Sequence, residues 1–427
     1  KALAQNMIVP ILFGSTEKNI GIKEFIQFIV DYVPAPMPID EKAALVFKTL
    51  ADPFLGKMTF FRVYGGVFTS DSVIYNSTRE VEEKMGQLFY LRGKNQENTS
   101  SVQPGDIAVV AKMQEVKTGD TLCAKDKKVV LDAIKFPLPC LPLAVTPKSK
   151  GDEDKLSSAL SRLVDEDPTI SVGKNTETKQ TILSGLGEMQ LDIVCEKLAR
   201  KFGVDVETQV PKIPYRETIK KQVQVEGKHK KQSGGHGQYG HVWIRMGPNP
   251  DKDFEFTEEI FGGAVPKNFF PAVEKGLREA MAEGFLAGYP MTNIKFTLYD
   301  GSYHSVDSSE MAFKLAAILA FKKGAEQAGA VLLEPVVEVE VKVPESFMGD
   351  VIGDLNSKRG RVLGMEPDGK FQVIKAHVPQ AEMMRYAVDL KAMTQGRGSF
   401  STKFVGYEEV PARLSESLVA QLKAEQE

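Results

Sequence analysis

A glycine-rich stretch preceded by lysines is the part of this sequence with the clearest chemical potential. Gly235, Gly237 and Gly240 fit the pattern G-x-G-x-x-G, which can cradle phosphates. A dinucleotide site needs an apolar strand before the glycines and a helix after them. Here lysines precede, and a strand with alternating apolar residues (Val242, Ile244) follows. The H-R-D and D-F-G motifs of a protein kinase do not occur. We therefore predict a projecting turn, which either contacts a ligand or is a plain surface hairpin.

The lysines before this turn form a local basic cluster in a chain whose net charge is only -3. One glutamate, Glu226, opposes five lysines. Such a cluster attracts phosphates irrespective of nucleotide sequence. A solvated strand edge, whose lysines discourage aggregation, is the alternative. The cluster consists of Lys220, Lys221, Lys228, Lys230 and Lys231.

A second polar loop, within DGSYHSVDSSE, precedes a long helix predicted at 308–328. Asp307 and Glu310 fit a capping box, which predicts a structural role for Asp307 at the helix start. Before them lie Ser302, Tyr303 and His304. If this loop and the glycine turn share one end of a domain, their hydroxyls, imidazoles and lysines suit RNA. His304 alone fits a loop hydrogen bond equally well, and no catalytic triad accompanies it.

Length and composition bound the class of protein. A chain of 427 residues predicts about three domains. Hydrophobic residues at 42% and charged residues at 26% are ordinary for a globular protein, and no apolar run approaches the roughly 20 residues that span a bilayer. We therefore expect no membrane segment. The three cysteines and five histidines lack disulfide or metal-ligand spacing, which predicts no metal site and favours a reducing cytoplasm.

Hydrophobic periodicity divides the chain into successive blocks. Residues 1–35 contain a predicted strand (8–15) and helix (21–32), too little for a domain, so we expect the tail of a larger one. Residues 36–135 read as short strands, among them 58–68, 72–79, 86–91 and 107–113, which favour an antiparallel β-barrel.

The remaining blocks mix helices and strands. Residues 136–212 and 332–407 each follow the order βαββαβ, the pattern of a ferredoxin-like sandwich. Between them, residues 213–331 carry both loops, a strand at 293–299 and two helices, at 266–287 and 308–328. Residues 408–427 are predicted to form a short terminal helix that docks on a neighbouring element. The fold class is therefore multidomain α+β.

Several long strings, in order, resemble elongation factor G, the translational GTPase that moves tRNA and mRNA through the ribosome. They are LSGLGEMQLDI, SGGHGQYGHV, DGSYHSVDSSEMAFKLAA and EPVVEVEVKVPESFMGDVIGDLNSKRGRV. The resemblance covers nearly the whole chain. It implies the end of a GTP-binding domain at 1–35, the domain II barrel at 36–135, ferredoxin-like domains III and V at 136–212 and 332–407, and a ribosomal-protein-S5-like domain IV at 213–331.

The resemblance also bears on nucleotide chemistry. FGSTEKN looks like the family's last guanine-recognition loop, which implies a partial nucleotide-binding role for Gly14, Ser15 and Thr16. No Gly-Lys pair is followed by Ser or Thr, so the P-loop pattern is absent. We expect no catalytic residue here and no GTP hydrolysis by this fragment. GTP and Mg²⁺ are expected cofactors of a full-length GTPase.

In the family, domain IV reaches the decoding centre with its tip against tRNA and mRNA. The implied phosphate contacts are Lys228, Lys230 and Lys231, and His304 and Gln238 are the strongest candidates at the tip. His236 stands where the family commonly has Arg, which removes a permanent charge and a planar donor fork. The tip residues implied by resemblance are Ser233, Gly234, Gly235, His236, Gly237, Gln238, Tyr239, Gly240, Ser302, Tyr303, His304 and Asp307.

The expected partners are the ribosome, ribosomal RNA, tRNA and mRNA, bound by a cytoplasmic monomer without membrane contact. Two alternatives remain open at this point. One is a paralogous ribosome-protection GTPase that displaces an antibiotic with the same architecture. The other is a GTPase-free RNA-binding protein.

Overall fold

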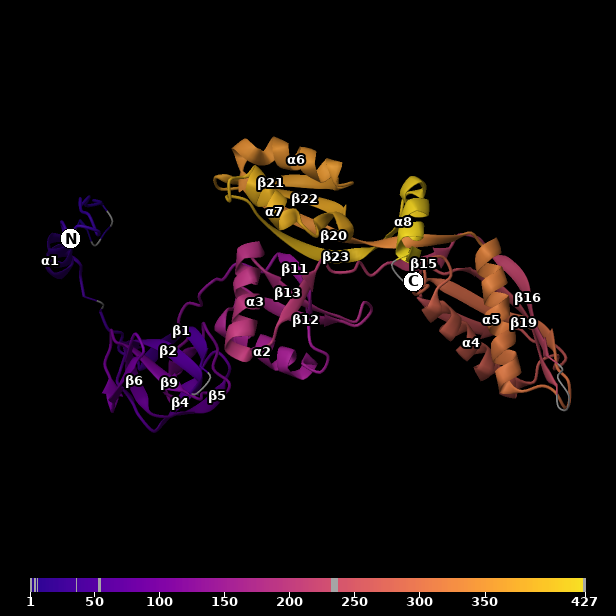
Figure 1. Cartoon of the computed structure of the whole chain (residues 1–427), viewed down its shortest axis with the longest axis horizontal. Helices are drawn as coiled ribbons and strands as arrows, with labels where there is room; N and C mark the ends of the chain where they lie inside the picture. The colour runs from indigo at the N-terminus through magenta and orange to yellow at the C-terminus, as the bar shows by residue number, and fades with distance from the viewer. Residues whose placement is uncertain are drawn as a thin grey trace. The chain divides into compact units, whose positions relative to one another are not determined.

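The computed structural model describes residues 2–424 apart from 4, 6, 36, 53, 54 and 232–236. Its contacts divide the chain into two compact units. One contains the residues before Leu138 together with Gly151–Ile170 and Lys197–Val204; the other contains Leu138–Lys150, Ser171–Glu196 and the residues from Asp205 onward. Helices and mostly antiparallel sheets alternate along the chain (Figure 1), so the predicted multidomain α+β class is confirmed.

Antiparallel strands make up most of the first unit. They are β1 (Ala43–Asp52), β2 (Gly56–Gly65), β3 (Phe68–Thr69), β4 (Ser72–Asn76), β5 (Val81–Met85), β6 (Leu88–Arg92), β7 (Asn95–Thr99), β8 (Ser101–Val102), β9 (Ile107–Ala111) and β10 (Thr121–Cys123). Eight form one sheet in the order β5-β4-β10-β1-β2-β9-β6-β7, and β3 pairs with β8. Alternate side chains point inward, and Phe61, Phe68, Leu88 and Leu122 are fully buried. The strands predicted in this block are confirmed as β2, β4, β6 and β9.

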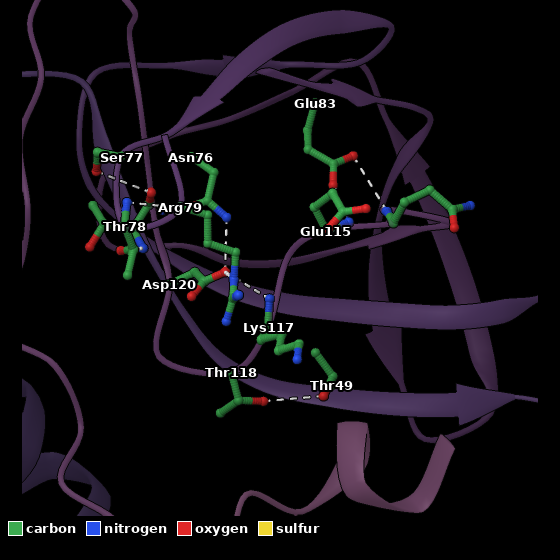
Figure 2. A network of polar contacts seen from close by, with 12 residues as sticks. Thr49, Asn76, Ser77, Thr78, Arg79, Glu83, Glu115, Lys117, Thr118 and Asp120 are labelled. Atoms are coloured by element: carbon green, nitrogen blue, oxygen red, sulfur yellow. Dashed lines mark hydrogen bonds and ion pairs between the residues drawn. The ribbon is translucent and has the colours of Figure 1, made fainter. Parts of the chain in front are cut away.

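A buried aspartate fixes the turns at one side of this sheet. Asp120 Oδ2 accepts hydrogen bonds from Asn76 Nδ2 (2.8 Å), Arg79 Nε (2.7 Å) and the Lys117 backbone N–H (2.8 Å), as Figure 2 shows. Asn76 Oδ1 in turn accepts from the Thr78 and Arg79 backbone N–H groups. The carboxylate is 4% exposed and Arg79 is 37% exposed. One side chain thus joins the loop after β4 to the loop before β10.

The first residues of the chain depart from prediction. Helix α1 (Ile22–Tyr32) is confirmed, but the strand predicted at 8–15 is wrong: residues 7–14 pair with no described strand, and only an isolated bridge joins Ser15 to Ile20. Ile8, Val9 and Phe13 are exposed. Apolar β-formers become a strand only when a neighbouring strand takes up their backbone hydrogen bonds.

The second unit begins with a four-stranded antiparallel sheet of β11 (Leu141–Pro147), β12 (Ser171–Asn175), β13 (Gln180–Gly185) and β14 (Val206–Gln209), in the order β12-β13-β11-β14. Helix α2 (Glu153–Glu166), which belongs to the first unit, and α3 (Glu188–Phe202) complete the chain order β11-α2-β12-β13-α3-β14. The predicted βαββαβ order is therefore confirmed for this segment.

The next sheet carries the two polar loops. It consists of β16 (Val223–Lys231), β17 (Gln238–Pro248), β18 (Phe254–Glu258) and β19 (Ile294–Ser302), in the order β16-β17-β19-β18, with β18 and β19 parallel. Helices α4 (Phe270–Glu283) and α5 (Glu310–Gln327) bury their apolar residues against the inward side chains of β17 and β19, and Figure 1 shows both helices beside the sheet. Strand β18 was not predicted, because the alternation of Phe254 and Phe256 with polar residues extends over too few positions to stand out from its surroundings.

The last sheet is built around the long strand β20 (Ala330–Pro344), which pairs with β22 (Phe371–Pro379) on one side and β23 (Ser399–Glu409) on the other. Strand β21 (Arg361–Asp368), which comes before β22 in the chain, pairs with the other edge of β22. Helices α6 (Met348–Ser357) and α7 (Tyr386–Met393) complete the predicted second βαββαβ order. The short strand β15 (Arg216–Ile219) also pairs with β20, through Arg216↔Leu333 to Ile219↔Ala330. This joining of an early strand to the last sheet was not predicted.

The terminal helix α8 (Ala412–Ala424) docks as predicted. Its Leu418, Val419 and Leu422 join a hydrophobic cluster with Tyr215 and Leu332. Burial raises the pKa of Tyr215 to about 12, so this phenol is neutral at physiological pH.

Candidate functional site

Strand pairing brings the two predicted loops to one end of the third sheet. β17 begins at Gln238 and β19 ends at Ser302, and the two strands are antiparallel with His241 opposite Ser302. The Tyr239 N–H donates to the Asp307 carbonyl at 2.8 Å, and a bridge joins Tyr239 to Ser308. We call residues 237–240 and 302–308 the tip. The predicted Ser233, Gly234, Gly235 and His236 lie outside the described residues.

Asp307 joins the two loops. Its Oδ1 accepts from the Gly237 N–H at 3.0 Å, and its side chain is 27% exposed. The predicted capping box is wrong: the N-cap of α5 is Ser309, whose Oγ accepts from the Ala312 N–H. Capping needs a side chain at the residue directly before the first helical turn, and the helix begins at Glu310, too late for Asp307.

His304 presents a hydrogen-bond donor to solvent. Its Nδ1 accepts from the backbone N–H groups of Asp307 (3.2 Å) and Val306 (3.4 Å), so the neutral ring carries its proton on Nε2. Within the described chain, Nε2 has no hydrogen-bond partner, and the side chain is 54% exposed. Nδ1 also lies 3.3 Å from Asp307 Oδ2, which would accept its proton in the charged form. Tyr303 beside it is 51% exposed.

A series of polar side chains extends from the tip along the sheet. Ser302 Oγ lies 2.8 Å from the Tyr239 hydroxyl and 2.7 Å from His241 Nδ1. His241 Nε2 is buried and lies 3.0 Å from Glu226 Oε1, in a geometry not aligned for a hydrogen bond. His241 was not among the predicted site residues, and Glu226 was predicted only to oppose the lysine cluster. The alternation along β17, which gives Tyr239 and His241 the same face, is the signal that could have found His241.

Close packing against α5 explains why residue 240 is a glycine. A Cβ on Gly240 would collide with the Ala312 carbonyl of α5, and a Cβ on Gly227 in β16 would collide with that of Ala316. Gly240 does not have a positive φ. Gly240 therefore lets α5 approach the sheet and does not serve an unusual backbone angle.

The structure divides the predicted lysine cluster. Lys228, Lys230 and Lys231 lie in the half of β16 near the tip, and in the part of the chain that the structure describes they form no ion pair. Alternation gives Lys228 and Lys230 one face of the sheet and Lys231 the other. Lys220 precedes β16 at its opposite end and pairs with Glu409 at 2.6 Å. Gln238, a predicted contact residue, is exposed, with Oε1 2.9 Å from His229 Nε2.

The predicted nucleotide-loop residues lie apart from the tip in the sequence and belong to the other unit. Gly14, Ser15 and Thr16 enter a turn closed by the Ser15–Ile20 bridge, in which Ser15 Oγ accepts from the Lys18 N–H at 3.3 Å. Among described residues, no group of three or more His, Cys, Asp or Glu could hold a metal ion. No helix in the described ranges has the length and apolarity needed to cross a bilayer.

A cavity of about 350 Å³ in the first unit lies between β1, β2 and α2. Three cations (Lys57, Lys112, Arg162) and three carboxylates (Asp52, Asp165, Glu166) line it together with apolar residues. Glu166 is 4% exposed and accepts from the Ala51 N–H and from Lys201. These balanced charges hold α2 against β1 and do not form a recognisable catalytic set.

Comparison with protein families agrees with this architecture. Four family models match successive segments: elongation factor G domain 2 at 41–125, domain III at 136–210, domain IV at 211–329 and the elongation factor G C-terminus at 331–418. The boundaries of the four segments follow the sheets, except that β15, within the domain IV segment, pairs with β20 of the C-terminal segment. The chain belongs to the elongation factor G family.

A solved structure gives the same result for the fold. The crystal structure of a protein from Thermus thermophilus is 37% identical in sequence, with a TM-score of 0.76. The match covers 100% of this chain and 64% of that one. This chain therefore spans less than two thirds of the length of that relative.

Proposed function

We propose that this chain is part of a ribosome-binding translation elongation factor that promotes GTP-dependent movement of tRNA and mRNA. Membership of the elongation factor G family supports the translation role. In the proposal, GTP and Mg²⁺ bind to parts of the full-length cytoplasmic protein beyond the segments described above. The tip enters the decoding centre and contacts tRNA, mRNA and ribosomal RNA.

The observation that carries the proposal is the joining of the two tip loops by Asp307. Asp307 also donates its backbone N–H to His304 Nδ1, which leaves the Nε2–H of the 54%-exposed His304 without a partner among the described residues, next in the sequence to the exposed Tyr303. A fixed imidazole donor suits a phosphate or 2′-hydroxyl oxygen, and an exposed ring suits a base. The tip acts as a wedge that occupies space and forms polar contacts, so no covalent step is assigned to it.

The test is single-turnover movement of mRNA on stalled ribosomes with the full-length protein and GTP. His304→Ala removes one outward donor, and we expect translocation to slow about ten-fold while ribosome-stimulated GTP hydrolysis stays nearly unchanged. His377→Ala, which removes a histidine of β22 that lies outside the tip, is the control and is expected to leave both rates unchanged.

Two results would contradict the proposal. An equal loss of hydrolysis and translocation in His304→Ala would mean that the tip does not act after nucleotide chemistry. Wild-type protein that releases a bound tetracycline-class drug without moving mRNA would be a ribosome-protection factor instead.

A further inference from the structure

A third loop, residues 259–265, reaches the same end of the sheet as the tip. β18 runs parallel to β19, with Glu258 opposite Leu298, and β19 continues to Ser302 in the tip. The chain leaving β18 must therefore continue alongside the last residues of β19. Contact confirms this course, because a Cβ on Gly301 would collide with the Val265 side chain.

The third loop is anchored at both ends. At its start, the Glu259 N–H donates to the Leu298 carbonyl at 2.8 Å, and the Glu259 carboxylate lies 3.3 Å from Arg245 Nη1. Ile260 packs against the core of this sheet, and at the far end Val265 is 1% exposed. The segment left between these anchors is short and projects from a rigid base.

Two glycines shape the projecting segment. Gly262 and Gly263 have φ of 65° and 72°, a region that other residues rarely adopt. A Cβ at either position would meet nothing within 4 Å, so the segment lies in open space. Phe261 directly before them is 94% exposed, the largest exposed fraction among the large hydrophobic residues that the structure describes.

Single exposed apolar residues are common on protein surfaces, but this one has a specific setting. Tyr303, Val306 and Met311, in and just beyond the neighbouring tip loop, are 51%, 60% and 56% exposed. The tip also carries the His304 donor, and lysines that form no ion pair with any described residue lie at the end of β16 on the other side of β17. Flat rings beside donors and cations are the composition of a surface that binds single-stranded nucleic acid.

We propose that Phe261 stacks on an unpaired RNA base and that the third loop is a further RNA contact at the tip. This inference rests on the proposed function and adds a contact to it. Glu258 beside the loop repels phosphates, so Phe261 receives the face of the base, while the lysines across the sheet receive the backbone. Stacking on an aromatic ring tolerates any base, which suits a factor that must act on every mRNA and tRNA.

The direct test uses full-length protein and a mixed-sequence single-stranded RNA of about twelve nucleotides with one central 2-aminopurine, whose fluorescence falls on stacking. Phe261→Ser is expected to weaken binding about ten-fold and to abolish most of the quenching. Phe261→Trp is expected to retain both. Phe404→Ser, which removes a 56%-exposed ring from β23, is the control and should match wild type.

Phe261→Leu separates stacking from plain apolar contact. A leucine variant that binds and quenches like wild type would overturn the proposal, since the partner would then recognise apolar surface, as a protein does. Wild-type affinity in Phe261→Ser would overturn it as well.

The same variants in the translocation assay distinguish this inference from the function on which it rests. If Phe261→Ser slows mRNA movement and Phe404→Ser does not, the contact operates on the ribosome. If His304→Ala slows movement and Phe261→Ser does not, the proposed function stands and the Phe261 contact fails. If wild-type protein moves no mRNA, the function fails, and the quenching result still decides whether Phe261 stacks on RNA.

Discussion

Two networks in this molecule are centred on an aspartate, and they differ in what they leave exposed. Asp120 in the first unit is 4% exposed and binds Asn76, Arg79 and the Lys117 N–H. Asp307 in the tip is 27% exposed, binds the Gly237 N–H and faces His304. The donors around Asp120 are directed inward and used within the fold. The donor beside Asp307, His304 Nε2–H, belongs to a 54%-exposed side chain and has no partner among the described residues.

This difference shows how similar polar chemistry serves stability in one place and recognition in another. A buried carboxylate must have its full set of partners, because an unmatched charge in a low-dielectric interior is costly. At the tip, solvent lowers the cost of an unpaired polar group. The network there can hold its loops together and still leave hydrogen-bond donors without a partner in the fold. The cations follow the same rule, since Arg79 has an ion-pair partner and Lys228 has none within the described residues.

The largest expected effect is on stability, in Asp120→Ala. The substitution leaves Asn76, Arg79 and the Lys117 N–H without their acceptor, and we expect the unit that contains them to lose about 3 kcal/mol of unfolding free energy. Thermal and urea unfolding measure the loss. Glu97→Ala is the control, because its ion pair with Arg92 is exposed and should contribute less than about 1 kcal/mol. Equal losses in the two variants would contradict the structural role of Asp120.

Asp307→Ala is expected to affect translocation more than stability. Loss of the Gly237 contact should cost only about 1 kcal/mol of stability, while loss of the carboxylate beside Gly237 and His304 slows translocation about ten-fold. Asp307→Asn keeps the Oδ1 acceptor and should restore most of the rate. A melting temperature as low as that of Asp120→Ala would mean that Asp307 also serves the fold and would remove the contrast between the two networks.

The smallest effect is expected from the lysines. Replacing Lys228, Lys230 and Lys231 together with Gln should leave stability unchanged. The slope of the logarithm of the ribosome-binding constant against the logarithm of salt concentration should become shallower by about two to three, because each lysine makes roughly one phosphate contact. The measurement is the binding constant at several salt concentrations. Lys220→Gln, at a lysine already paired with Glu409, should leave the slope unchanged. An unchanged slope in the triple variant would identify an ordinary solvated strand edge.

Local sequence pattern predicted much of the fold. The apolar spacing in α2, α3 and α6 and the alternation in β2, β17 and β22 are strong signals, because each element buries one face. Strand β18 was missed because it is short, and β15 because its partner, β20, lies more than a hundred residues away. The strand predicted at 8–15 failed for the related reason that pairing partners are not encoded locally.

The site could be predicted in composition but not in geometry. The residues of the two loops were recognisable, yet Asp307 looked like a helix cap because only the structure shows that α5 begins at Glu310. Gly240 looked like a turn residue, although its neighbour is a helix carbonyl that comes from a distant segment. His241 and the third loop depend on strand register, which one sequence does not reveal.

The pairing of β15 with β20 has a mechanical consequence. The chain enters the sheet of the tip after Ile219 and leaves it before Ala330, and these two residues are paired with each other. The whole segment that carries the tip is thus an insertion between two hydrogen-bonded neighbours of another sheet. A domain attached by a single linker can swivel freely, but one attached through paired strands resists twisting. A force on the inserted segment is therefore passed through this strand pair to the sheet of β20 and is not lost in a flexible linker.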